Sequence, residues 1–103
     1  DLVNIAGKRT SLAHLNFLLN SIDGVRDGEF VVPEGDDDAV PRLAAIVVAP
    51  GISPRQIRAE LRQRIDPTFL PRPLRFVDEL PRNHLGKISR EAALRLAAHH
   101  RAR

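Results

Sequence analysis

Apolar residues recur at helical spacing in three parts of the chain. Each part follows a serine, a residue type that often caps a helix N-terminus, so the pattern predicts helices at three places: residues 12–22 after Ser11, 54–65 after Ser53 and 90–100 after Ser89. In the second of these, Ile57, Leu61 and Ile65 lie on one line at i, i+4 and i+8. That line predicts a buried helix face.

Shorter apolar segments predict five strands. Residues 3–5 and 8–10 flank Ala6-Gly7 and predict a hairpin, because Gly7 can adopt the positive φ of a tight turn. Three further strands are predicted over residues 28–33, 43–49 and 74–77. Val47 and Val48 are neighbours on a strand and must point to opposite faces. Both are apolar, so we expect both faces of that strand to be covered.

The order of these elements predicts an α+β fold. We expect an N-terminal β-hairpin, followed by a central three-stranded sheet packed with about three helices. The 103 residues suffice for one compact domain with a modest core. With four Phe and no Trp or Tyr, that core must consist mainly of Leu, Ile, Val and Ala. We therefore treat residues 1–103 as a single domain.

Composition and charge narrow the function classes. The net charge is +3 and the pI is near 10.5, which invites a nucleic-acid interpretation. Aromatic platforms for stacking bases are nearly absent, however, so we predict no nucleic-acid binding. No apolar run approaches the roughly 20 residues of a membrane span. The chain has no cysteine and no signal peptide, and we expect a cytoplasmic protein. It lacks an initiator Met, which suggests a piece of a longer protein.

Several familiar chemical motifs are missing from the sequence. There is no Ser-His-Asp order, HExxH, CxxC or glycine-rich phosphate loop. Asp36-Asp37-Asp38 and His99-His100 resemble metal ligands, but we interpret them as a solvated loop and a polar tail, and predict no metal site. A stripe of Arg55, Arg58 and Arg62 is interpreted as a solvated helix face, with docking to phosphate or to an acidic partner as the alternative.

The use of lysine points to two loops. Of the sixteen Lys and Arg residues only Lys8 and Lys87 are lysine. An ammonium is a compact charge on a flexible stem, whereas guanidinium is a planar fork. Lys87 follows Gly86, which has no Cβ and lets the backbone approach a ligand closely. A positive charge in this position suits neutralisation of a phosphoryl group or a carboxylate.

Two segments carry a resemblance to a known family. Residues 80–94 contain Leu-Pro, a short polar stretch, Gly86-Lys87 and an Arg-led helix, and they resemble the C-terminal motif of the adenylate-forming enzymes. This superfamily comprises acyl-CoA synthetases, peptide-synthetase adenylation domains and luciferases. Residues 1–9 resemble its hinge-adjacent hairpin motif. The resemblance implies that the chain is the mobile C-terminal domain of an AMP-forming acid ligase.

The resemblance also implies a mechanism. Family members use ATP and Mg²⁺ to convert a carboxylic acid into an acyl-adenylate, with Lys87 as the catalytic charge and Gly86 beside it. The small domain then swings, and the hairpin with Gly7, Lys8 and Arg9 lines the route of a pantetheine thiol from CoA or an acyl carrier protein. The acid, ATP and Mg²⁺ sites would belong to an N-terminal domain, so the isolated chain would be inactive.

Two points keep other interpretations open. Family members commonly carry Glu where this chain has His14 and Asn16, which suggests a divergent branch. The alternative function is a small basic, non-catalytic module that binds RNA or an acidic protein, in which Lys87 is only surface charge. A third possibility is a free-standing domain that completes a separately encoded partner.

Overall fold

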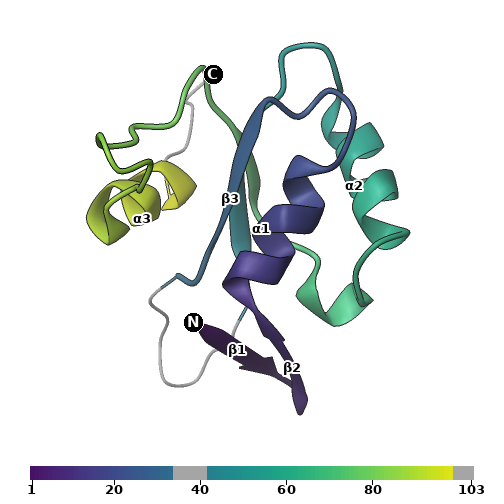
Figure 1. The fold of residues 1–103 in the computed structure, drawn as a ribbon. Helices are drawn as coiled ribbons and strands as arrows, with labels where there is room; N and C mark the ends of the chain where they lie inside the picture. The colour runs from purple at the N-terminus through teal and green to yellow at the C-terminus, as the bar shows by residue number, and fades with distance from the viewer. Residues whose placement is uncertain (34–41, 99–103) are drawn as a thin grey trace.

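The computed structural model describes residues 1–33 and 42–98 and confirms the predicted α+β fold (Figure 1). Its elements, in chain order, are β1 (Leu2–Ile5), β2 (Lys8–Ser11), α1 (Leu12–Asn20), β3 (Asp27–Val31), β4 (Ala44–Val48), α2 (Pro54–Arg62), the 3₁₀ helix η1 (Pro67–Phe69), β5 (Leu74–Phe76) and α3 (Arg90–Ala98). Strands β1 and β2 form a separate antiparallel hairpin.

Strand β4 is the centre of the three-stranded sheet. It pairs antiparallel with β3 and parallel with β5, and all five of its residues are buried. Ala45 and Val47 pack into a core with α1 and α2, whereas Ile46 and Val48 pack into a second core with α3. Figure 1 shows α1 and α2 on one side of β3 and α3 on the other. The prediction that both faces of this strand are covered is therefore confirmed.

Helix α1 closes the outer edge of β3. The side-chain oxygen of Asn16 accepts a hydrogen bond from the Phe30 amide at 2.6 Å, and the Asn20 side chain donates to the Gly28 carbonyl at 3.0 Å. These bonds satisfy backbone groups that an edge strand otherwise leaves unpaired. Asn16, one of the two departures from the family pattern, thus has a structural role.

Two predicted helices end earlier than their apolar pattern suggests. Helix α1 stops at Asn20 and α2 at Arg62, two and three residues before the predicted ends. In both, the backbone tightens to i→i+3 hydrogen bonds beyond that point, as in Ser21 to Leu18 and Gln63 to Glu60. Apolar residues beyond these ends, Ile22 and Ile65, remain buried. The pattern therefore identified the buried face correctly but not the end of the helix.

The predicted N-caps are confirmed. Ser11 accepts a hydrogen bond from the His14 amide, and Ser89 accepts one from the Ala92 amide. Ser53 does more, because Gln56 returns a bond to its backbone and completes a capping box that the sequence interpretation did not include. None of the helices in the described part of the chain is long and apolar enough to cross a membrane.

Close packing of α1 against β3 depends on Gly28. A Cβ added there would lie 2.7 Å from Leu19 Cδ2. We expect Gly28→Ala to lower the free energy of unfolding by about 1–3 kcal/mol, because Leu19 must shift within a filled core. Urea unfolding of the 103-residue chain measures this.

The matched control is Gly51→Ala. A Cβ at Gly51 meets nothing within 4 Å, so its stability should change by no more than about 0.5 kcal/mol. Equal stability changes in the two variants would contradict the packing argument.

Candidate functional site

Lys87 lies in the loop that joins β5 to α3. Leu80 anchors the start of this loop in the second core, and Ile88 packs against the same core at its end. Backbone bridging between Arg82 and Ile88 closes the loop between these anchors. The polar segment from Asn83 to Lys87 is therefore an exposed turn on a fixed base.

Asn83 organises the turn from within. Its side-chain oxygen accepts hydrogen bonds from the amides of Leu85, at 2.8 Å, and Lys87, at 3.0 Å. Its own amide donates to the Lys87 carbonyl, and its carbonyl accepts from the Gly86 amide. Gly86 has a φ of +80°, in the region that favours glycine. The predicted need for glycine beside Lys87 is thus met by the turn itself.

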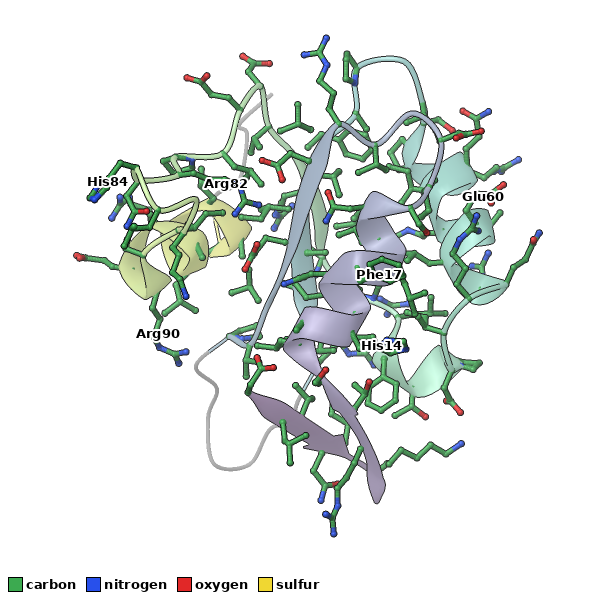
Figure 2. The ribbon with its side chains drawn as sticks, in the orientation of Figure 1. His14, Phe17, Glu60, Arg82, His84 and Arg90 are labelled. Atoms are coloured by element: carbon green, nitrogen blue, oxygen red, sulfur yellow. The ribbon has the colours of Figure 1, made fainter. Side chains whose placement is uncertain are left out.

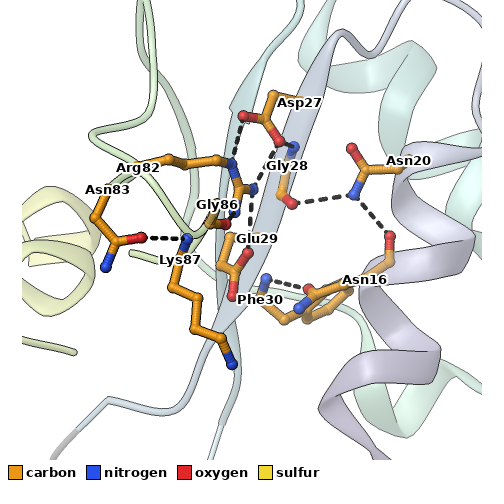
Figure 3. Close-up of polar contacts among 10 residues, drawn as sticks. All are labelled: Asn16, Asn20, Asp27, Gly28, Glu29, Phe30, Arg82, Asn83, Gly86 and Lys87. Carbon is orange, nitrogen blue, oxygen red and sulfur yellow. Dashed lines mark hydrogen bonds and ion pairs between the residues drawn. The ribbon is translucent and has the colours of Figure 1, made fainter. Parts of the chain in front are cut away.

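Arg82 ties the turn to β3 through all three guanidinium nitrogens (Figures 2 and 3). Nε and Nη2 donate to the two carboxylate oxygens of Asp27 at 2.9 and 2.7 Å, and Nη2 also lies 3.3 Å from Glu29 Oε1. Nη1 donates to the Gly86 carbonyl at 2.8 Å. The hydrogen bond from Arg82 lowers the pKa of the Asp27 carboxyl, and the bond to Asp27 raises the pKa of Arg82.

The Lys87 ammonium is left available by this arrangement. Within residues 1–33 and 42–98, no hydrogen bond or ion pair involves its Nζ atom. Figure 3 shows the side chain extending away from the Arg82 contacts while its backbone amide is held by Asn83. A fixed backbone with a free, exposed ammonium can reach a negatively charged group on another surface.

The hairpin residues form a second group. Ala6 and Gly7 both have positive φ, at 52° and 82°, as a type I′ turn requires, so the predicted turn is confirmed. Lys8 Nζ donates to Asp66 Oδ2 at 2.7 Å, and Arg9 is exposed. Lys8 therefore ties the hairpin to the N-terminus of η1, whereas Lys87 is unpaired within the described residues.

The structure does not bring the two groups together. In Figure 1 the hairpin and the loop before α3 lie on different sides of the molecule. A ligand bound by one group therefore does not touch the other in this arrangement.

The arginine stripe divides between two environments. Arg58 and Arg62 line a groove of about 450 Å³ with Arg42 and Arg72, and Arg58 donates to the Pro71 carbonyl at 3.0 Å. Arg55 is exposed and does not line the groove.

The metal-ligand candidates lie elsewhere. Asp36–Asp38 and His99-His100 fall outside the described residues. Over the described ranges, no group of three His, Cys, Asp or Glu side chains forms a metal-binding cluster.

Comparison with known proteins identifies the family. A family model described as "AMP-binding enzyme C-terminal domain" matches residues 20–87, which is more than half of the chain. The chain belongs to the AMP-binding enzyme C-terminal domain family. The matched segment ends at Lys87 and leaves out the hairpin.

Relatives of this AMP-binding C-terminal domain fall into two enzyme groups. It is 34% identical to delta-poly-L-ornithine synthetase of Acinetobacter baumannii over 89% of the chain and 7% of that protein. It is 32% identical to acetyl-coenzyme A synthetase of Mycolicibacterium smegmatis over 87% of the chain and 10% of that protein. The fatty acyl CoA synthetase of Mycobacterium tuberculosis matches with a TM-score of 0.72 and 27% identity, covering 88% of the chain and 18% of that structure.

The chain thus spans a tenth or less of these curated relatives. The relatives and solved structures agree with the resemblance of the sequence to adenylate-forming enzymes. They give no support to the alternative of an RNA-binding module.

Sequence reasoning missed the residues that hold the loop. Asp27 and Glu29 are two apart on a strand and so share a face, which was the available signal for a cationic partner. That Arg82 is this partner depends on a contact across 55 residues of sequence.

The Lys8–Asp66 contact predicts a measurable pKa. The hydrogen bond from Lys8, with help from Thr68, lowers the pKa of Asp66 from 3.8 to about 2. Because the folded pKa is depressed, the contact stabilises the fold above the unfolded pKa and loses this effect as the pH falls through about 2. We expect Lys8→Gln to raise the Asp66 pKa toward 3.8 in a carboxyl-carbon NMR titration.

Arg9→Gln is the control for this titration, because it removes a cation from the same hairpin without touching Asp66. A larger rise in the Asp66 pKa with Arg9→Gln than with Lys8→Gln would show that the contact is not the cause.

Proposed function

We propose that this chain is the C-terminal domain of an AMP-forming carboxylic acid ligase. The observation that carries the proposal is the unpaired Lys87 ammonium on a turn whose backbone is fixed, in a chain of this family. The ligase would act with its own N-terminal domain, which supplies the acid and ATP sites. ATP and CoA are cytoplasmic metabolites, so we propose the cytoplasm as its location.

In the first half-reaction, a carboxylate oxygen of the acid attacks the α-phosphorus of ATP. A new oxygen–phosphorus bond forms, the bond to pyrophosphate breaks, and the acyl-adenylate remains. Lys87 would place its positive charge beside the acid carboxylate and the α-phosphate. There it offsets negative charge that develops in the transition state. A water-excluded site between the two domains would strengthen this effect.

Mg²⁺ would neutralise the phosphates of ATP in this reaction. The described residues of this chain offer no acidic cluster to hold it. We therefore assign Mg²⁺ to the N-terminal domain and derive no step of this domain through it.

In the second half-reaction, a pantetheine thiol attacks the acyl carbonyl, and AMP leaves as the thioester forms. The hairpin turn at Gly7 would line the path of the thiol, with Lys8 and Arg9 beside it. Because the hairpin and Lys87 lie on different sides of the domain, each half-reaction would require a different orientation of the domain. The relatives include CoA and peptide synthetases, so CoA and a carrier-protein pantetheine are the two acceptors.

Lys87→Ala in the full-length ligase tests the first assignment. We expect the adenylation rate to fall roughly 10²–10³-fold, because the variant lacks the charge that stabilises the transition state. Acid-dependent exchange of pyrophosphate into ATP measures the rate.

Arg55→Ala is the matched control, since it removes an exposed cation from α2, across the sheet from the loop. Equal pyrophosphate exchange by wild type and Lys87→Ala would refute the catalytic role of Lys87.

Gly7→Asn tests the hairpin. Asn tolerates positive φ, so this variant adds a side chain at the turn with little backbone strain. We expect thioester formation from supplied acyl-adenylate to slow at least tenfold, while pyrophosphate exchange stays close to wild type.

Gly51→Asn serves as the control, because it also adds a side chain at a glycine in open space. If Gly7→Asn slows both half-reactions alike, the hairpin does not line the thiol path.

A further inference from the structure

We propose that Arg82 is a positioning residue for Lys87, and that its attachment to β3 sets where the Lys87 ammonium can reach. This inference rests on the proposed function, because it concerns the adenylation half-reaction. It adds to that function a residue pair, Arg82 and Asp27, that acts through the backbone and touches no substrate.

The peptide group between Gly86 and Lys87 carries the argument. Its carbonyl oxygen accepts from Arg82 Nη1 at 2.8 Å, and its N–H donates to the Asn83 side chain at 3.0 Å. Both polar atoms of the peptide that precedes Lys87 are therefore held, by two consecutive side chains. This fixes the plane from which the lysine side chain starts, whereas the ammonium itself stays free (Figure 3).

The guanidinium connects this peptide to the core sheet. Its bidentate contact with Asp27 fixes its plane relative to β3, and its remaining nitrogen points at Gly86. Strand β3 pairs along its whole length with β4, whose residues are all buried. The position of Lys87 is thus set by the most rigid part of the domain.

The energetics favour positioning over stability. The Arg82 and Asp27 side chains keep 29% and 31% of their exposure, and ion pairs that solvent reaches contribute little to folding. A bidentate fork nevertheless restricts orientation strongly, which a lysine in the same place cannot do. A displacement of about 1 Å at a reacting group can cost on the order of 100-fold in rate.

The arrangement predicts selectivity between the half-reactions. Among the described residues, the contacts of Arg82 go to β3 and to its own loop, while the hairpin is attached through Lys8 to Asp66. Loss of the Arg82 contacts should therefore displace Lys87 and leave the hairpin in place. A residue that only stabilised the fold would affect both half-reactions.

Arg82→Gln in the full-length ligase is the test. We expect the kcat of adenylation, from pyrophosphate exchange, to fall roughly 10- to 100-fold with little change in the KM for the acid. Thioester formation from supplied acyl-adenylate should stay at the wild-type rate. Because Arg82 acts through Lys87, the double variant with Lys87→Ala should be no slower than Lys87→Ala alone.

Arg64→Gln is a closely matched control. Arg64 has the same 29% side-chain exposure and forms a 2.6 Å ion pair with Glu60 on α2, on the opposite side of the molecule (Figure 2). Both half-reactions should be unaffected by it. If Arg82→Gln does not fold, as judged by circular dichroism, Asp27→Asn replaces it, and the same selective loss is expected.

Three outcomes separate this inference from the proposed function. Slow adenylation in Lys87→Ala with normal adenylation in Arg82→Gln overturns the positioning role alone. Equal slowing of both half-reactions in Arg82→Gln does the same. Normal adenylation in Lys87→Ala overturns the proposed function itself, and the inference with it.

Discussion

The burial of β4 on both faces is the constraint on which the other features depend. A strand with apolar residues on both faces requires a layer on each side. Helices α1 and α2 supply one layer and α3 supplies the other. Because α3 must cover the far face, the segment that leads from β5 to α3 has to pass beside the sheet. That path brings the Lys87 loop against β3.

Polar contacts at the edge of the sheet then give this loop its shape. Asp27 and Glu29 point to the α3 side of β3, where Arg82 binds them. On the other side, Asn16 and Gly28 allow α1 to lie close against the same strand. One edge strand therefore carries the helix packing on one face and the candidate site on the other.

The two lysines of the chain have different surroundings as a result. Lys8 is engaged with Asp66, and Lys87 is unpaired in the described part of the chain. A small rigid domain that presents the hairpin on one side and a free ammonium on another suits an enzyme in which two steps use two orientations. This is the physical content of the family resemblance for this chain.

The sequence by itself determined the elements, the α+β class, the buried strand and the Gly86-Lys87 turn, because these follow from local spacing, capping residues and glycine. Helix ends at Asn20 and Arg62 were set by backbone tightening that apolar spacing does not record. Only the tertiary structure decided that Arg82 binds Asp27 and that Lys8 binds Asp66. Those pairs are 55 and 58 residues apart. Local pattern carries no information on such partners, since the choice depends on which surfaces the packed core brings together.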